Sequence, residues 1–465
     1  MKNKIYNYKF ELVFLSILII GFLFRYLNNF DQIFWNDENY TLFITDPSIK
    51  FEEFLNRHKK IDESPILYFY ILRIFNNIYY TAEHLRLSSI IFSTLSIIAS
   101  YKLFRIFYDK QTSLFCLAII SLNIFLIWQA KEARIASSIV FFGIINVILF
   151  YKFLINNSLK YKLSLFLINL FSLSYYPFLL LIVISQFFYV ILNNKTKIKS
   201  YIIILLLTFI FYIFLNIDYI LLKAGKPYHH FHLDISFFVN YFFRSFFGSI
   251  IFGGLSLIIF TISFFQLIIK KRNHFIIFNV YLIIVTYGFA ISYSLFKDGG
   301  VIAPRYYIFL IPSIIIIITE FFNNKKFQNL KYFYLIITLF NSFILFDDWK
   351  IQKPRASYLL NNINTEISNN YFTDEGSHKE FQEVYDYYFL KSSILKKKIN
   401  YISKKSIQEY DVLYFICLNH AEMHVGLNKN IQNPLKCNKN LKNFSIFSEK
   451  EIKDFKIILY KKDIN

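Results

Sequence analysis

Charged residues are scarce in this chain of 465 residues, and cysteines are scarcer still. Asp, Glu, Lys and Arg together make up 18% of the sequence, whereas a soluble globular domain usually carries about 25%. Three cysteines are too few for the disulfide framework of a small secreted domain. No segment of roughly 20–50 residues repeats along the chain, which argues against a solenoid or propeller.

Apolar residues take the place of the missing charges. They make up 55% of the sequence, aromatic residues make up 21%, and the mean hydropathy is +0.41. The net charge of +20 would suit a nucleic-acid partner, but most lysines lie in short loops between long apolar runs. This distribution is the positive-inside pattern of membrane proteins and outweighs the nucleic-acid interpretation. We therefore predict a multi-pass membrane protein that does not bind nucleic acid.

Eleven apolar runs approach the ~20 residues that a helix needs to cross a bilayer. The first run starts with basic residues but has no small-residue cleavage site before Arg25-Tyr26, which predicts a retained span and not a removed signal peptide. The runs 162–174 and 177–193 are short, and a single kinked helix is the alternative for them. The predicted crossings are 10–28, 85–104, 112–128, 135–154, 162–174, 177–193, 200–216, 246–269, 275–295, 306–322 and 330–346.

Lysines and arginines set the orientation of these crossings. With the N-terminus inside, the basic clusters fall on the inner side at 102–110, 152–162, 195–199, 270–272 and 325–331. This arrangement requires that segment 65–80, which is short and carries Arg73, does not cross the membrane. We predict that the segment forms a juxtamembrane helix on the outer face. The chain then makes roughly eleven crossings and ends outside.

The C-terminal part of the chain is polar and differs from the rest. Short β-like runs lie near 411–418 and 455–461, and helix-like stretches lie near 355–368 and 380–395. We predict a membrane-embedded domain over 1–349, with a first outer loop at 29–84, and a small extracytoplasmic α/β domain over 350–465. Cys417 and Cys437 both lie in the second domain, where a disulfide and a pair of free thiols are equally open.

Ionisable residues gather at the outer ends of the predicted crossings. The spans carry almost none at mid-depth, where the main polar interruptions are Asn123, Asn146, Asn169 and Gln186. A proton- or ion-coupled transporter would instead place ionisable groups near the midplane. The outer segments hold carboxylates, arginines and histidines: Asp37, Glu38, Glu63, Arg134, His229, His230 and Arg305. This placement favours surface chemistry on a membrane-borne substrate.

Carboxylates beside arginines at a lipid surface indicate a particular kind of chemistry. A carboxylate can act as a general base toward a hydroxyl or bind a divalent cation through its oxygens. A guanidinium is planar, permanently charged and bidentate, which suits a phosphate. The sequence thus indicates a phosphate-linked lipid donor and a hydroxyl or amine acceptor. Since a phosphate is already a fair leaving group, one base suffices where a glycosidase generally needs two carboxylates.

Each of these groups also fits a structural role. The alternatives are a solvated loop for Asp37-Glu38, a helix start for Glu63-Ser64-Pro65, interfacial anchoring for Lys131, Glu132 and Arg134, and a snorkelling arginine with an aromatic belt for Arg305-Tyr306. The histidines at 229, 230 and 232 are of a type that binds zinc, but no second ligand set at metal spacing accompanies them.

In order along the chain, the outer motifs resemble those of the GT-C membrane glycosyltransferases. The resemblance is closest to the branch of the protein O-mannosyltransferases and the aminoarabinose transferase that modifies lipid A, and it covers roughly residues 1–350. Its motifs are an acidic pair after the first span (Trp35 to Thr41), a Pro-headed apolar segment after a glutamate (Glu63 to Tyr68), a Gln-x-x-Glu-Ala-Arg turn (Gln129 to Arg134) and a late Arg-Tyr followed by a proline (Arg305-Tyr306 and Pro312). Ser64 departs from the pattern, because many relatives have a second proline there, and this leaves the role of Glu63 open.

The resemblance implies an α-helical multi-pass GT-C fold and an inverting sugar transfer. The donor would be a polyprenyl-phosphate sugar, and the acceptor a lipid, a glycan or a protein at the outer face of a bacterial inner membrane. It assigns three groups of residues: Asp37 and Glu38 to catalysis, Arg134, Arg305 and Tyr306 to the donor phosphate, and Glu63 with His229 or His230 to a divalent cation if one is bound. The alternatives from other classes are a lipid-linked saccharide flippase or transporter and a non-catalytic subunit of an envelope-glycan machine.

Overall fold

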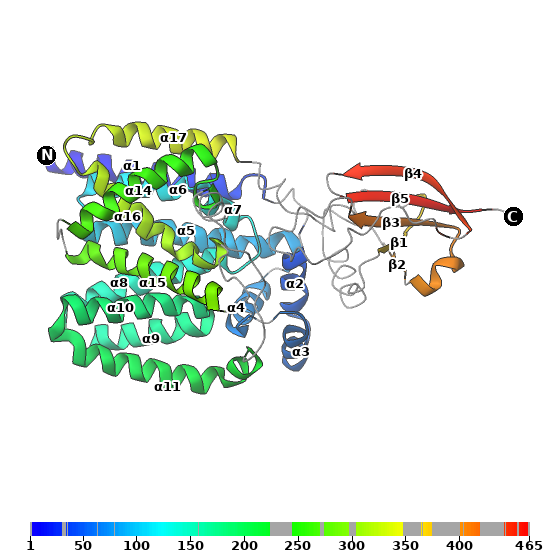
Figure 1. Ribbon diagram of the computed structural model, residues 1–465, viewed down its shortest axis with the longest axis horizontal. Helices are drawn as coiled ribbons and strands as arrows, with labels where there is room; N and C mark the ends of the chain where they lie inside the picture. Colours follow the sequence, from blue (N-terminus) through cyan, green and yellow to red (C-terminus); the bar gives the residue numbers. More distant parts are fainter. Residues whose placement is uncertain are drawn as a thin grey trace.

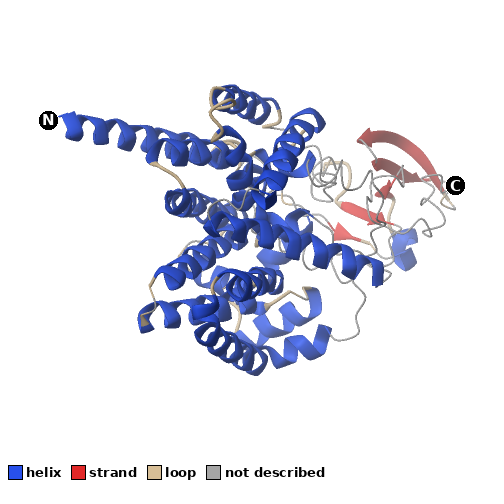
Figure 2. Cartoon of the chain, turned by 60° about the vertical axis from the view of Figure 1, so that its left-hand side comes forward, coloured by secondary structure: helices blue, strands red, loops and turns tan. Residues whose placement is uncertain are grey.

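A bundle of helices and a small β-sheet make up the chain (Figure 1). The computed structural model describes residues 2–29, 34, 36–62, 64–78, 80–156, 158–223, 244–269, 274–296, 304–346, 364, 366–373, 400–402, 404–418, 441, 443–452 and 455–463. The helix α1 (Lys2–Tyr26) starts at the end of the bundle that is remote from the sheet, and the C-terminal strand lies in the sheet (Figures 1 and 2). The start of α1 and the C-terminal strand therefore lie at opposite ends of the structure.

The bundle is built from helices that coincide with the predicted apolar runs. They are α1, α5 (Ala82–Phe107), α6 (Lys110–Ser121), α7 (Ile124–Ala130), α8 (Ala136–Ile155), α9 (Leu159–Tyr175), η1 (Pro177–Leu179), α10 (Leu180–Asn193), η2 (Lys195–Lys197), α11 (Ile198–Lys223), α13 (Arg244–Phe247), α14 (Ile250–Ile269), α15 (His274–Phe296), η4 (Pro304–Leu310), α16 (Ile311–Phe322) and α17 (Leu330–Ile344). Among the described residues, six helices are long and apolar enough to cross a membrane, and the bent pair α6–α7 would be a seventh. The multi-pass membrane fold is thus confirmed.

Three shorter helices are separate from the long helices of the bundle: α2 (Asn36–Ile44), α3 (Phe51–Ile61) and α4 (Ile66–Asn76). Figure 1 shows them at the end of the bundle that faces the sheet. With 11 residues, α4 is about 16 Å long, well short of the ~30 Å hydrocarbon core. The length agrees with the prediction that segment 65–80 does not cross the membrane.

The chain breaks between α9 and α10 and again between α6 and α7, and each break has a visible cause. Tyr176 has extended dihedral angles (φ −154°, ψ 109°) and Pro177 opens a new turn, so α9 and α10 are separate helices and not one kinked helix. The pair α6–α7 bends by 55° around Leu122. Asn123 starts α7 by accepting a hydrogen bond from Leu126 N at 3.0 Å.

Arg25 stabilises this bend from the neighbouring helix α1. The side chain is fully buried, and its Nη1 donates to the carbonyl oxygens of Gly21 and Ser121 at 2.8 Å each, while Nε donates to Ser93 Oγ at 2.6 Å. Carbonyls at a helix C-terminus lack intrahelical partners and carry partial negative charge, which a cation satisfies. A buried arginine in the last turn of α1 therefore fixes the break before α7.

The polar residues within the spans join helices to one another. Asn146 of α8 donates to Asn169 Oδ1 of α9 at 2.9 Å and accepts from Gln186 Nε2 of α10 at 2.6 Å. Tyr201 of α11 donates to Gln186 Oε1 at 2.9 Å. Hydrogen bonds of this kind hold helices together in lipid, where apolar contact alone does not drive association.

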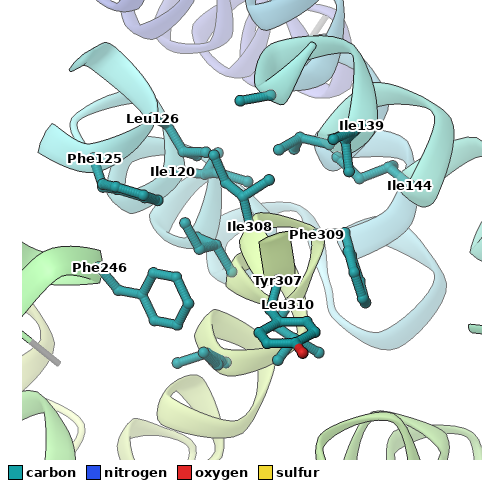
Figure 3. Close-up of a cluster of buried hydrophobic side chains, with 14 of the residues drawn as sticks. Ile120, Phe125, Leu126, Ile139, Ile144, Phe246, Tyr307, Ile308, Phe309 and Leu310 are labelled. Atoms are coloured by element: carbon teal, nitrogen blue, oxygen red, sulfur yellow. The ribbon is translucent and has the colours of Figure 1, made fainter. Parts of the chain in front are cut away.

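The core of the bundle around η4 is apolar and densely packed. Figure 3 shows Ile308 of η4 on the side of Ile120, Leu126 and Phe125, and Phe309 on the side of Ile139 and Ile144 of α8. A Cβ on Gly143 of α8 would lie 3.2 Å from Phe309 Cβ, so η4 packs directly on this helix. This packing fixes the residues that precede Ile308 in η4.

The sheet has five strands in the order β2-β1-β3-β5-β4. The strands are β1 (Asn370–Thr373), β2 (Asn400–Tyr401), β3 (Val412–Leu418), β4 (Phe444–Ile452) and β5 (Phe455–Lys462). β1 pairs in parallel with β2 and β3, whereas β5 pairs antiparallel with β3 and β4. The predicted runs 411–418 and 455–461 coincide with β3 and β5.

Two predictions for this region cannot be compared with the structure. The helix-like stretches near 355–368 and 380–395 lie almost wholly outside the described residues, and so do the side chain of Cys417 and the whole of Cys437. The domain boundary at residue 350 and the state of the two thiols stay predictions.

Candidate active site

Two adjacent carboxylates open helix α2, and the structure gives them different surroundings. Asp37 and Glu38 lie in the first turn, where the helix dipole favours negative charge. The side chain of Glu38 is fully buried, whereas that of Asp37 is 26% exposed. Their neighbours therefore decide what each can do.

Glu38 is fully engaged in hydrogen bonds. Its Oε1 accepts from Arg86 Nε at 2.7 Å and from Ala133 N at 2.8 Å, and its Oε2 accepts from Arg86 Nη2 at 2.8 Å. Arg86 also donates to Asn29 O at 2.7 Å. The pair joins α2 to α5 and to the turn after α7. A carboxylate in this setting positions backbone segments and presents no free oxygen to a substrate, so the geometry favours a supporting role for Glu38.

Asp37 has the opposite character. Its Oδ2 lies 3.6 Å from Arg305 Nη1 and 3.9 Å from Arg134 Nη2. These distances are too long for hydrogen bonds, and within the described part of the chain the Asp37 carboxylate accepts none. Two cations stabilise its charge without occupying its oxygens. Asp37 is consequently the carboxylate of the pair whose oxygens are open to a substrate.

Arg134 lies in the turn between α7 and α8, at the centre of the site. Its Nη1 is 3.2 Å from Asp62 Oδ2, 3.1 Å from Thr41 Oγ1 and 3.2 Å from Asp37 O. Burial alone would lower the pKa of Arg134, but Asp37 and Asp62 outweigh it and raise that pKa. The guanidinium is permanently charged and is already surrounded by oxygen acceptors.

The turn that carries Arg134 is fixed from several sides. Ala133 N binds Glu38, and Ser89 Oγ of α5 donates to Arg134 O at 3.3 Å. Trp128 Nε1 of α7 donates to Leu345 O at 3.2 Å, and Lys131 Nζ lies 3.5 Å from the centroid of the Phe346 ring. The position of Arg134 therefore depends on α2, α5 and the end of α17 together.

Asp62, which follows α3, is a member of the site that the sequence did not single out. Its Oδ1 accepts from Ser64 N at 2.8 Å while its Oδ2 faces Arg134. Burial tends to raise the pKa of Asp62, but Arg134, Ser64 and His58 together lower it. Several acids lie in the first outer loop, and no spacing in the sequence distinguishes Asp62 from them.

His58 lies behind Asp62 on α3. Its Nε2 is 2.9 Å from Ser64 O. Burial lowers the pKa of His58, although Asp62 and the Ser64 carbonyl oppose this effect. The ring also packs edge-on against Phe69, with 5.1 Å between centroids. His58 thus supports the loop that carries Asp62.

Arg305 and Tyr306 reach the site from η4. The side chain of Arg305 is 48% exposed, which makes it the more accessible of the two arginines near Asp37. Its guanidinium carbon lies 5.6 Å from the Tyr306 ring centroid, and Tyr306 stacks on Phe178 of η1 with 5.4 Å between centroids and 7° between planes. An aromatic pair and an open guanidinium thus lie side by side next to Asp37.

The residues predicted to bind a divalent cation lie outside the described residues. This applies to Glu63, His229 and His230. The described parts of the chain contain no group of three histidine, cysteine, aspartate or glutamate side chains that could hold a metal ion. Cation binding stays a prediction.

Comparisons with known proteins support the fold that these motifs indicate. Residues 63–218 match the model of the family described as dolichyl-phosphate-mannose-protein mannosyltransferase. The structure of ArnT from Cupriavidus metallidurans bound to undecaprenyl phosphate is similar with a TM-score of 0.54, at 8% identity, over 98% of both chains. The apo state of the same ArnT is similar with a TM-score of 0.52, at 8% identity, over 99% of this chain and 98% of the other. No curated protein sequence matches the chain significantly.

These matches confirm the predicted resemblance. ArnT is a glycosyltransferase with the GT-C fold, and the chain shares that fold along almost its whole length. The family match spans the segment that contains α4 to α10 and most of α11, and with it Arg134.

Proposed function

From the premise that the chain is a membrane glycosyltransferase with the GT-C fold, we propose that it transfers a sugar from a polyprenyl-phosphate donor to a hydroxyl acceptor. The observation that carries the proposal is the Asp37 carboxylate, which is partly exposed, accepts no hydrogen bond from a described residue and lies within 3.9 Å of two arginines. The family description names a dolichyl-phosphate sugar, and ArnT binds undecaprenyl phosphate; both support a donor of this class.

The transfer is a single displacement at the anomeric carbon. The acceptor hydroxyl gives its proton to Asp37 as its oxygen bonds to the anomeric carbon. The bond from that carbon to the phosphate oxygen breaks at the same time, and polyprenyl phosphate leaves with one additional negative charge. Attack from the face opposite the phosphate inverts the configuration. A general base of this kind contributes about 10²–10⁴-fold to a rate.

The two arginines would play different parts in this step. Arg305 is half exposed and touches Asp37 only at 3.6 Å, so its donors are available to the phosphate, whose charge grows as the bond breaks. Tyr306 and Phe178 would line the same side with an apolar surface. Arg134 is already hydrogen-bonded to three acceptors and would act mainly by holding the carboxylates in place.

The location of the reaction follows from the predicted topology. The site lies at the end of the bundle where α2, α3 and α4 cap the long helices (Figure 1). With the basic loops inside, this end faces away from the cytoplasm. We place the enzyme in a bacterial inner membrane with its site on the periplasmic side, where an acceptor lipid, glycan or protein would reach it.

A divalent cation belongs to the same proposal. Glu63, His229 and His230 would supply the carboxylate and imidazole ligands that such an ion accepts. Loss of transfer on chelation, followed by recovery when a defined divalent cation is returned, would support it. Full activity after exhaustive chelation would reject it.

The central test is transfer by purified protein in lipid nanodiscs. Each member of a panel of polyprenyl-phosphate sugars is supplied, and release of polyprenyl phosphate is measured. Asp37→Asn keeps the shape of the side chain and removes the base, so we expect a loss of at least about 100-fold in kcat. Asp109→Asn is the matched control, because Asp109 only caps α6 through Thr112 N at 2.9 Å on the predicted inner side.

Full transfer by Asp37→Asn would overturn the catalytic assignment. Movement of the donor across sealed vesicles that contain no acceptor, unaffected by Asp37→Asn, would favour a flippase instead.

A further inference from the structure

Asp62 extends the site beyond the residues that the sequence motifs assign. We propose that Asp62 is a positioning residue of the transfer reaction: it binds Arg134 and thereby keeps the Asp37 carboxylate free for the acceptor. This inference rests on the proposed function, because it concerns the same carboxylate and the same step.

The first argument is the unequal sharing of Arg134 between the two carboxylates. Arg134 Nη1 lies 3.2 Å from Asp62 Oδ2, which is hydrogen-bond distance, whereas Arg134 Nη2 lies 3.9 Å from Asp37 Oδ2, which is not. The guanidinium is therefore bonded to Asp62 and only close to Asp37. A bidentate pair between Arg134 and Asp37 would occupy the oxygens that have to accept the proton.

The second argument is the rigid support of Asp62. Its Oδ1 accepts from Ser64 N at 2.8 Å, and its own N donates to His58 O at 3.0 Å. The side chain is 12% exposed, compared with 22% for Arg134 and 26% for Asp37. Exposure thus rises from Asp62 through Arg134 to Asp37, with the fixed anion at the closed end of the row and the reactive one at the open end.

The third argument is that the helices on either side of Asp62 are bound to the last turn of α2 and to Thr45, which directly follows α2. Arg57 Nη1 of α3 donates to Phe43 O at 3.0 Å. Asn76 Nδ2 of α4 donates to Thr45 O at 3.1 Å and to Thr45 Oγ1 at 2.9 Å. Because α2 also carries Asp37, the separation of Asp62 from Asp37 is fixed by these contacts, and Arg134 fits between them.

The consequence for catalysis follows from charge. If Asp62 loses its negative charge, Arg134 keeps Asp37 as its nearest anion and closes the 3.9 Å gap. The closed pair occupies the Asp37 oxygens with hydrogen bonds, so they are no longer open to the proton of the acceptor. Donor binding changes little, because Arg305 is untouched. The step that slows is proton removal from the acceptor.

Asp62→Asn tests this effect, since the amide oxygen still accepts from Ser64 N while the negative charge and the acceptor that faces Arg134 are lost. We expect kcat to fall about 10–100-fold, a part of the whole contribution of a general base, while KM for the donor stays within about twofold. Asp62→Glu should recover a substantial part of kcat. Asp109→Asn serves again as the control for the loss of a turn-capping carboxylate.

A double-mutant cycle tests the route through Arg134. If Asp62 acts through Arg134, Asp62→Asn and Arg134→Gln together lower kcat no further than the more severe single variant, whereas Asp62→Asn and Arg305→Gln multiply. Multiplicative losses in the first pair, or wild-type kcat in Asp62→Asn, would overturn the inference.

The outcomes also separate this inference from the proposed function. If wild-type protein transfers sugar, Asp37→Asn does not, and Asp62→Asn is unaffected, only the role of Asp62 is rejected. If wild-type protein consumes no donor of the panel, the proposed function fails. The Asp62–Arg134 link is then judged by thermal unfolding, where additive effects of the two single variants would reject it.

Discussion

Removing the charge of Glu38 should strongly destabilise the protein. Glu38→Gln keeps the size of the side chain but leaves Arg86, whose side chain is 1% exposed, without its counter-ion. Breaking a buried, hydrogen-bonded ion pair by removing one partner typically costs about 3–5 kcal/mol. The variant also weakens the bond from Ala133 N, so we expect the turn that carries Arg134 to loosen.

The chain offers a matched control for this prediction. Arg57 and Glu53 form a pair at 3.0 Å on α3, with side chains 18% and 51% exposed. An exposed pair of this spacing contributes only about 0.3–0.5 kcal/mol, so Glu53→Gln should hardly change the unfolding temperature. The assay is thermal unfolding of both variants in the same detergent, followed by donor consumption at a temperature at which both are folded.

The double variant Glu38→Leu with Arg86→Met removes both charges together. Replacement of a buried pair by apolar residues of similar volume is often neutral or stabilising, so the double variant should unfold at a higher temperature than Glu38→Gln. Equal unfolding temperatures for Glu38→Gln and Glu53→Gln would refute the reasoning, because they would show that burial adds nothing to this pair.

Two further changes test other parts of the structure. Arg305→Gln should lower kcat/KM for the donor about 10–150-fold, the loss of one charge-assisted hydrogen bond of about 1.5–3 kcal/mol. Part of the loss should fall on kcat, because the charge on the phosphate grows as the bond breaks. Steady-state kinetics with Arg305→Lys as the conservative variant measure it, and an unchanged kcat/KM would exclude Arg305 from phosphate binding. Gly248→Ala should lower the unfolding temperature, because Gly248 has φ +83° and an added Cβ would overlap Ile124 and lie 2.8 Å from Leu345 Cδ1. Gly288→Ala, where an added Cβ meets no atom within 4 Å, is its control, and equal unfolding temperatures would show that the turn at Gly248 adapts without cost.

Most of the fold could be predicted because membrane-spanning helices are recognisable in a sequence by their length and hydropathy. Every predicted run coincides with a helix or a broken pair, since a spanning segment has to satisfy its own backbone hydrogen bonds. The break between 162–174 and 177–193 was predicted, whereas the run 112–128 did not reveal that it breaks after Leu122. The 55° bend after Leu122 depends on Arg25 from another helix, and no local pattern encodes that contact.

The sheet was predicted less completely. β3 and β5 are rich in apolar β-formers and were recognised, whereas β4 carries alternating charges and β1 and β2 have only four and two residues. Short and polar strands give little signal, because their place in a sheet is set by the neighbours they pair with.

In the site, the sequence brought together the right segments but could not rank the residues within them. Asp37 and Arg305 were predicted to meet across the chain, and their side chains lie 3.6 Å apart. Asp37 and Glu38 are adjacent and chemically alike, and only the position of Arg86 makes one of them buried and the other open. Asp62 was missed because its importance comes from Arg134, which lies 72 positions away.

The attachment of the Arg134 turn to the end of α17 has a consequence for the order in which the site assembles during synthesis of the chain. Asp37 belongs to α2, and Arg305 belongs to η4. Leu345, whose carbonyl oxygen accepts from Trp128 Nε1, directly follows α17. A ribosome delivers these parts in that order, so Asp37 is synthesised long before Arg305 and the Leu345 carbonyl. The complete constellation can assemble only when the whole bundle has been inserted, and a partly synthesised chain has no finished site with which to act on the lipid-linked sugars around it.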